Sequence, residues 1–105
     1  MSCAFLAGKG KLACDKDAIK VKSWFQERLK TQDDFSKANN WYRIVSYNDK
    51  AYVIQGSCCT NCRWRPTYFD CEGNEMIISN EDRKPLADKW KHEGEVIWKG
   101  TNCKD

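Results

Sequence analysis

The sequence predicts an α+β domain: an N-terminal helix packed on an antiparallel sheet of four or five strands, with a short C-terminal helix and stabilising disulfides. Three observations support this fold class. A periodic helical segment comes first, two pairs of β-rich runs separated by turn residues follow, and seven cysteines occur in 105 residues. Because no internal repeat divides the chain, we expect residues 14–105 to form one domain with its helices on one face of the sheet.

Residues 1–13 (MSCAFLAGKGKLA) are typical of a flexible leader or tether, because glycines and lysines alternate there without helical or strand-like periodicity. Cys3 lies within this segment, and an odd number of cysteines leaves one without a disulfide partner. Its position near the start is that of the acylated cysteine of bacterial lipoproteins, so Cys3 is a lipidation candidate; an unpaired thiol is the alternative. The apolar run from Cys3 to Ala7 is too short for a signal peptide, so we expect an exported chain to be in its mature form.

The segment CDKDAIKVKSWFQERLKTQ, residues 14–32, predicts the first helix. Asp15 is placed to cap the N-terminus of this helix. Apolar residues recur at helical spacing: Ala18, Val21, Phe25 and Leu29, with Ile19 and Trp24 widening the stripe. Such a stripe needs a surface to cover. The polar stretch DDFSKANN, residues 33–40, predicts a connection to the sheet.

The β-rich part begins with WYRIVSYNDKAYVIQG, residues 41–56, which predicts a hairpin turning at Asn48 and Asp49. Asn and Asp tolerate the left-handed conformations that tight turns require. A second hairpin is expected over PTYFDCEGNEMIIS, with its turn at residues 72–74. The C-terminal third predicts a short helix with Pro85 in its first turn and Gly94 as its stop, followed by a final strand in EVIWKG.

Six cysteines are interpreted as structural disulfides: Cys14, Cys58, Cys59, Cys62, Cys71 and Cys103. The adjacent Cys58 and Cys59 point to opposite faces of an extended chain, so two separate partners are expected, with Cys62 and Cys71 nearest to them. Cys14 and Cys103 would then tie the two ends of the domain together. A bond between them would close a loop of about 90 residues and stabilise the fold by roughly 4 to 5 kcal/mol.

Two other uses of the same cysteines stay open. Cys59 and Cys62 have the spacing of a zinc knuckle, which Cys71, Cys58 or His92 would complete, although structural zinc sites usually pair two knuckles and only one is present here. The same spacing occurs in thiol–disulfide oxidoreductases, where a helix N-terminus activates the first thiol. Here the strand-like sequence RWRP follows instead. We therefore expect a protein without metal, other cofactor or enzymatic activity.

Charge and cysteine content also limit the compartment and the partners. The net charge of +3 arises in residues 1–30, which hold seven basic and three acidic residues, so we expect no nucleic-acid partner. The cysteine content is typical of an oxidising compartment, which predicts a secreted, periplasmic or lipid-anchored surface protein. No segment has the length and apolarity of a membrane span. Membrane contact is expected only through a lipid anchor at Cys3, and the protein is expected to be a monomer.

The candidate binding residues are aromatic and basic: Trp41, Tyr42, Arg63, Trp64 and Arg65. Rings and guanidinium groups on a sheet face suit a protein hot spot or carbohydrate stacking. The alternative is that the rings fill the small core. The sequence thus predicts an exported, non-enzymatic binding or interaction module for a protein or carbohydrate ligand, with the thiol–disulfide and zinc functions as alternatives.

Several short motifs follow one another in a recognisable order: CDKDAI at the first helix, then YNDKAYVI, SCC, YFDCEGN and a terminal NCKD. This order resembles a family of small secreted bacterial proteins, many of them lipoproteins, whose function is unassigned. The resemblance covers residues 14–78 and the terminal cysteine. It implies export, a helix followed by hairpins, and disulfides, but no activity. The chain departs from the family in Cys62 and Cys71, in lacking a cysteine after the EGN turn, and in the Lys- and Trp-rich residues 83–99.

Overall fold

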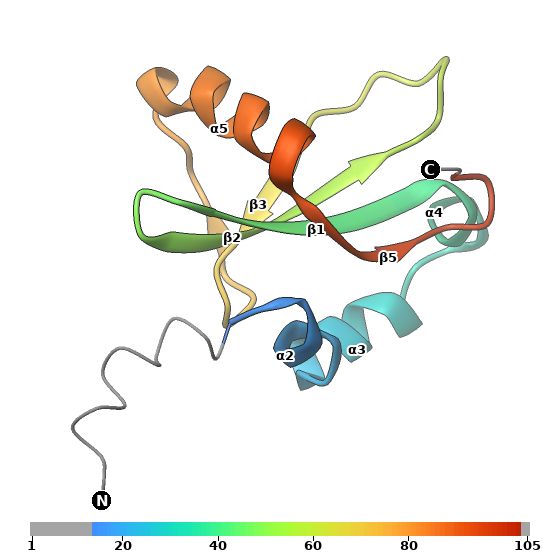
Figure 1. Cartoon of the computed structure of the whole chain (residues 1–105). Helices are drawn as coiled ribbons and strands as arrows, with labels where there is room; N and C mark the ends of the chain where they lie inside the picture. The colour runs from blue at the N-terminus through green and yellow to red at the C-terminus, as the bar shows by residue number, and fades with distance from the viewer. Residues whose placement is uncertain (1–13, 104–105) are drawn as a thin grey trace, which may run out of the picture.

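The computed structural model describes residues 14–103 and confirms an α+β fold, in which these residues form four helices and a five-stranded antiparallel sheet. The strand order is β4-β3-β2-β1-β5 (Figure 1). The elements are α2 (Lys16–Lys20), α3 (Ser23–Lys30), α4 (Asp34–Asn39), β1 (Asn40–Tyr47), β2 (Lys50–Ser57), β3 (Thr67–Phe69), β4 (Glu75–Met76), α5 (Asn80–Glu93) and β5 (Glu95–Lys99). The predicted leader and Cys3 lie outside the described residues.

Helices cover both faces of the sheet, so the prediction of helices on one face is wrong. Helices α2 and α3 lie on one side of the sheet and α5 crosses the other (Figure 1). Each side has its own apolar core. The α2/α3 side buries Ile19, Phe25, Tyr42, Ile44, Val53, Phe69 and Ile97. The α5 side buries Val45, Tyr52, Ile54, Tyr68, Leu86 and Trp90.

The predicted first helix is divided into two. Asp15 caps α2 as expected, and its Oδ1 accepts a hydrogen bond of 2.8 Å from the backbone N–H of Ala18. Helix α2 ends at Lys20, and α3 begins after a two-residue break at Val21 and Lys22. Val21 is therefore turned outward and is 79% exposed, although its spacing predicted a core position.

Residues 34–39 form helix α4 where a polar connection was predicted. Asp33 caps it, because its Oδ1 accepts a hydrogen bond of 2.8 Å from the backbone N–H of Ser36. The backbone and side-chain hydrogen bonds with Ser36 lower the pKa of the Asp33 carboxyl below its ordinary value. The segment contains one large apolar residue, Phe35, and this residue is exposed in the structure. No apolar periodicity therefore predicts the helix. Capping alone was the signal for this short helix.

Both predicted hairpins are confirmed. The β1–β2 turn places Asn48 and Asp49 at φ values of 51° and 64°, the left-handed region that a two-residue turn requires. The β3–β4 turn contains Gly73 at φ 90°. A Cβ atom at Gly73 would lie 2.5 Å from the Trp24 ring, so the turn packs closely against α3.

Helix α5 begins earlier than predicted. Ser79 caps it, and its Oγ accepts a hydrogen bond of 3.3 Å from the backbone N–H of Asp82. Pro85 therefore lies inside the helix rather than in its first turn, where it removes one backbone donor. Gly94 ends α5 as predicted, and β5 starts at the next residue.

The disulfides are Cys14–Cys71, Cys58–Cys103 and Cys59–Cys62. Cys58 and Cys59 have different partners, as predicted, and Cys59 is bonded to Cys62. The expected Cys14–Cys103 bond is wrong, and so is the expectation that Cys71 pairs with Cys58 or Cys59. Because Cys71 lies in the β3–β4 turn beside the start of α2, it is the nearer partner for Cys14. Sequence separations of 57 and 45 correspond to about 4 kcal/mol for each long-range bond in the chain-entropy model, against about 1.5 kcal/mol for the separation of 3.

Within residues 14–103, no helix combines the length and the apolar composition needed to cross a bilayer.

Candidate functional site

The structure brings the predicted binding residues Trp41 and Trp64 into contact and adds Arg43 beside Trp41, while the exposed Arg63 and Arg65 flank Trp64 along the chain. We call this surface the arginine–tryptophan face and define it by Trp41, Arg43, Arg63, Trp64 and Arg65. Trp41 and Arg43 come from β1 on the α5 side of the sheet, and the other three residues come from the connection between β2 and β3. Trp64 is 40% exposed, and Arg63 and Arg65 on either side of it are exposed. An aromatic ring between two accessible cations is the main chemical feature of this surface.

Trp41 connects the arginine–tryptophan face to the core. Its ring meets the Trp64 ring edge-on, with centroids 5.9 Å apart and an interplanar angle of 87°, and it also contacts Trp90 of α5 at 5.1 Å. The guanidinium carbon of Arg43 lies 4.9 Å from the Trp41 ring centroid. These contacts hold Trp41 half-buried and leave Trp64 as the outer ring.

Gly56 is what allows Trp41 to lie flat on the sheet. It is the β2 partner of Trp41, and a Cβ atom there would lie only 2.2 Å from Trp41 Cζ2. The ring therefore occupies the space that a side chain would fill. Glycine in a strand interior commonly marks such a close approach.

Two disulfides hold the connection that carries Trp64. Cys58–Cys103 fixes its start to the C-terminal segment, and Cys59–Cys62 closes a short loop within it. The backbone N–H of Cys58 also donates a hydrogen bond of 2.8 Å to the carbonyl oxygen of Asn39. Trp64 thus follows a covalently restrained loop, which reduces the conformational entropy that binding would cost.

A hollow of about 410 Å³ adjoins the arginine–tryptophan face. It lies between α5 and the β3–β4 hairpin and has an apolar lining that includes Tyr68, Met76 and Ile78. Arg65 and Arg83 contribute two cationic groups and Glu75 contributes one carboxylate, so the lining has a net positive charge. The hollow extends the basic and apolar character of the arginine–tryptophan face toward the edge of the sheet.

Tyr42 does not belong to this surface, and its prediction as a binding residue is wrong. Strand alternation turns it to the α2/α3 side, where it is fully buried and its ring contacts Phe25 at 5.1 Å. Burial raises the pKa of the Tyr42 hydroxyl above its ordinary value, and the nearby Arg28 partly opposes that shift. Because neighbouring residues within a strand point to opposite faces of the sheet, Trp41 and Tyr42 of β1 do not share one surface, and the sequence alone predicts this separation.

The cysteines form no arrangement of free thiols within residues 14–103, because all six are bonded in pairs. The Cys59–Cys62 bond lies in a turn, and no helix begins beside either sulfur. In the same range, no three His, Cys, Asp or Glu side chains are grouped so that they could hold a metal ion. His92 contacts its own helix, with Nδ1 2.8 Å from the carbonyl oxygen of Asp88.

Sequence reasoning missed Arg43, Gly56 and Trp90 as parts of this surface. Arg43 could have been found from its spacing of two from Trp41, which places both side chains on one face of the strand. The contribution of Trp90 depends on which face α5 covers. The face that α5 covers is determined by packing between residues far apart in the chain, so no local sequence pattern predicts it.

Comparisons of the chain with protein-family models, curated proteins and solved structures find no match. The functional argument therefore rests on the geometry of the molecule.

Proposed function

We propose that this protein is an exported, non-enzymatic binding module that contacts a protein partner through the arginine–tryptophan face. The observation that carries the proposal is Trp64, an exposed ring between two exposed arginines directly after the loop that Cys59–Cys62 closes. Trp and Arg are the residue types most enriched among interface hot spots. The adjoining apolar hollow with Arg65 and Arg83 favours a partner segment that combines acidic and aliphatic side chains.

A protein ligand suits this face better than a polysaccharide does. The Trp41 and Trp64 rings are nearly perpendicular, at 87°, so they offer no coplanar pair of rings on which successive sugars would stack. An edge-to-face pair instead presents a step into which an aliphatic side chain fits. The surrounding arginines would then pair with carboxylates at the rim.

Selection of peptides on the intact protein tests the proposal. A random phage-displayed peptide library is selected on the wild-type protein alone, and the affinity of each selected peptide is then measured for the wild type and for Trp64→Ala. We expect acidic, aliphatic-rich peptides whose affinity falls at least about 30-fold in Trp64→Ala, as for a hot-spot residue. Phe35→Ala, which removes an exposed ring on α4, is the matched control and should leave their affinity unchanged. If every selected peptide binds Trp64→Ala as well as wild type, the face is not the binding surface.

Export is the second part of the proposal. The three disulfides indicate an oxidising environment. We propose that the chain is secreted, periplasmic or anchored at the cell surface through a lipid on Cys3. Alkylation of thiols in intact cells, followed by intact mass under non-reducing conditions, should show one alkylated thiol or none. Six or more alkylated thiols would contradict export, and a mass increase removed by Cys3→Ser would identify the lipid.

Thiol–disulfide exchange is the second candidate function, and one observation favours it. Cys62 is exposed, so the Cys59–Cys62 bond is accessible to a partner thiol, whereas Cys103 of the Cys58–Cys103 bond is buried. Equilibration with glutathione buffers distinguishes the two functions. A structural bond should have a potential below about −300 mV, and a value between about −270 and −120 mV would favour redox activity. A zinc site built from Cys59 and Cys62 would require the same bond to be reduced, since cysteine binds the metal as a thiolate.

A further inference from the structure

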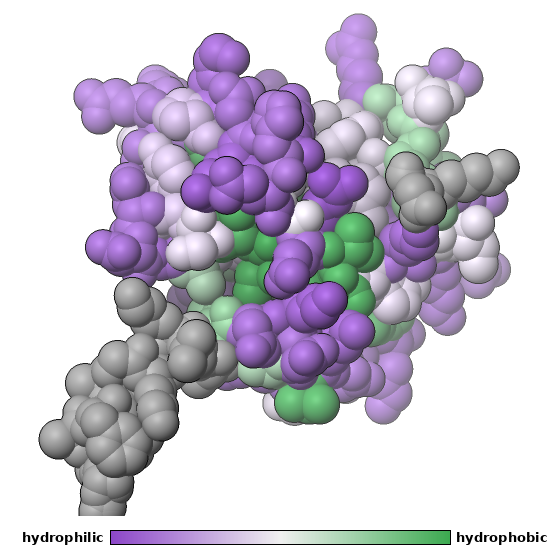
Figure 2. Space-filling view, viewed as in Figure 1, coloured by the Kyte–Doolittle hydropathy of each residue, from purple (hydrophilic) through white to green (hydrophobic). Residues whose placement is uncertain are grey.

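A second hollow shares no lining residue with the arginine–tryptophan face. It has a volume of about 770 Å³ and lies between the C-terminal end of α5, the start of β5 and the segment that begins α2. Figure 2 shows a hydrophobic floor ringed by hydrophilic residues in this region. The floor is apolar, with Ile44, Val45 and Ala51 among its residues. We call this hollow the acidic groove.

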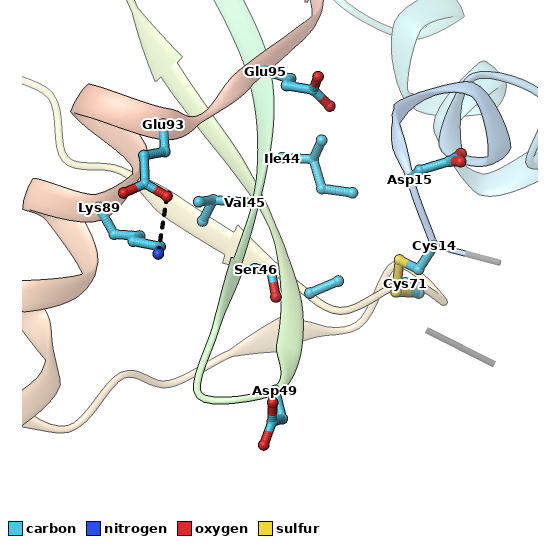
Figure 3. Close-up of a pocket in the computed structure, with 11 residues that line it drawn as sticks. Cys14, Asp15, Ile44, Val45, Ser46, Asp49, Cys71, Lys89, Glu93 and Glu95 are labelled. Carbon is cyan, nitrogen blue, oxygen red and sulfur yellow. Dashed lines mark ion pairs between the residues drawn. A yellow bond between two sulfur atoms is a disulfide. The ribbon is translucent and has the colours of Figure 1, made fainter. Parts of the chain in front are cut away.

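Carboxylates surround the acidic groove from several elements. Glu93 and Lys89 come from α5, Glu95 begins β5, Asp15 lies beside the Cys14–Cys71 bond, and Asp49 lies at the hairpin turn (Figure 3). Among the lining residues, Lys89 is the only basic one, and its Nζ lies 2.9 Å from Glu93 Oε1. The lining therefore keeps a net negative charge after that ion pair is formed.

An open strand edge runs into the same groove. Strand β5 pairs with β1 only as far as Ile44, which is opposite Glu95, because the chain before Glu95 turns away into α5. Val45, Ser46 and Tyr47 of β1 continue beyond that point with β2 on their other side. The edge of β1 beyond Ile44 is therefore not paired with β5. Ser46 lies on this open edge and lines the groove.

The hairpin register shows which backbone groups face this open position. Tyr47 and Lys50 flank a two-residue turn, so they form a hydrogen-bonded pair, and alternation makes Ser46 a residue whose N–H and C=O point away from β2. The same alternation directs the carbonyl of Asn40 to the β5 side, where it accepts a hydrogen bond of 2.8 Å from the N–H of Gly100. Ser46 thus offers a backbone donor and acceptor into the groove.

We propose that the acidic groove binds an extended, cationic segment of a partner protein, which adds to the β1 edge in line with β5. The N–H and C=O of Ser46 would pair with the backbone of that segment, as in other cases of strand addition. Its alternate residues would place lysine or arginine near Glu95 and Asp49 and an aliphatic side chain on the floor at Val45. This site is separate from the arginine–tryptophan face and selects the opposite charge.

A short fluorescent peptide in which lysine alternates with valine is the probe, and its affinity for the intact protein is measured by fluorescence anisotropy. A peptide in which glutamate replaces each lysine is the control. We expect only the lysine peptide to bind, with an affinity that decreases as salt is raised, because the charges are partly exposed. Equal binding of the glutamate peptide would overturn the proposal.

Variants separate the charge contribution from the backbone contribution. Glu95→Gln combined with Asp49→Asn should weaken the lysine peptide about threefold to tenfold, and both residues are exposed, so the fold should persist. Glu81→Gln, an exposed carboxylate outside the groove, is the matched control and should bind as wild type. If the double variant and the control bind the lysine peptide equally well, the carboxylates of the groove do not contribute to peptide binding.

Ser46→Pro tests the strand edge. Proline removes the N–H that faces the groove and leaves the β2 ladder intact, whereas Ser46→Ala keeps the N–H. We expect Ser46→Pro to lose peptide binding and Ser46→Ala to keep it, with both variants melting cooperatively. Equal affinity of the two variants would overturn strand addition. Concentration-dependent dimerisation of the wild type that Ser46→Pro abolishes would instead assign the groove to a second copy of this chain.

Discussion

The two faces of the sheet use aromatic residues in opposite ways. On the α2/α3 face, Phe25, Tyr42 and Phe69 are buried almost completely and contact one another or Trp24. On the α5 face, the aromatic contacts run from Trp90 through Trp41 out to the exposed Trp64. The difference follows from coverage: two helices close the first face, whereas α5 crosses only part of the second. We infer that the first face stabilises the fold and that the second presents a surface.

The largest expected effect is on the α2/α3 face. Phe25→Ala should lower the free energy of unfolding by about 3 to 5 kcal/mol, because it removes a buried ring and leaves a cavity among packed neighbours. Trp64→Ala should lower it by less than about 1 kcal/mol, since that ring is 40% exposed. Urea unfolding followed by circular dichroism measures both values. If both substitutions lower the free energy of unfolding equally, the α2/α3 face and the α5 face do not differ in their contribution to stability.

The second prediction concerns the junction between the α5-face core and its exposed ring. Gly56→Ala should destabilise the fold by about 1 to 3 kcal/mol, because a Cβ 2.2 Å from Trp41 Cζ2 forces the ring to move. The same substitution should cost much less in a Trp41→Ala background, where the ring is absent. A double-mutant cycle measures the coupling between the two positions. Additive losses would show that Trp41 does not depend on the glycine.

The comparison of the faces also shows what local sequence signals can and cannot predict. Period-two alternation, turn residues and helix caps predicted both hairpins, the Asp15 cap and the Gly94 stop, because these features depend on a few neighbouring residues. They did not predict that α5 covers the second face. Nor did they predict the Cys14–Cys71 bond, which depends on where the β3–β4 turn meets α2. Such placements result from contacts between residues far apart in the chain.

The candidate site was predictable to the same extent. Arg63, Trp64 and Arg65 were identified because a tryptophan ring between two guanidinium groups has the chemistry of a binding surface. Tyr42 was included in error, although its neighbour Trp41 already occupied the opposite face of β1. The acidic groove had no local signal, since its carboxylates come from α5, β5, the hairpin turn and the start of α2.

The smallest expected effect concerns the β3–β4 turn, which closes the α2/α3 face at one end. Here Trp24 Nε1 donates a hydrogen bond of 2.9 Å to the carbonyl oxygen of Cys71. Asp70 Oδ1 accepts hydrogen bonds of 2.9 Å from the backbone N–H groups of Glu72 and Asn74. Partial burial acts to raise the pKa of Asp70, but the hydrogen bonds from residues 72–74 outweigh it, so the pKa lies below its ordinary value.

A carboxyl whose pKa is lower in the folded state contributes stability above its unfolded pKa, and that contribution is lost as the pH falls through the folded pKa. The difference in unfolding free energy between wild type and Asp70→Asn should therefore be constant near neutral pH and should shrink from about pH 5 downward. Glu75→Gln, on the same hairpin and exposed, is the control for general charge effects. Because Asp70 is only partly buried, water screens these hydrogen bonds and the effect should be small. If the difference in unfolding free energy instead grows as the pH falls, the turn does not favour the ionised form of Asp70. The Cys14–Cys71 bond and the Trp24 hydrogen bond would then hold this end of the α2/α3 face without a contribution from the Asp70 carboxylate.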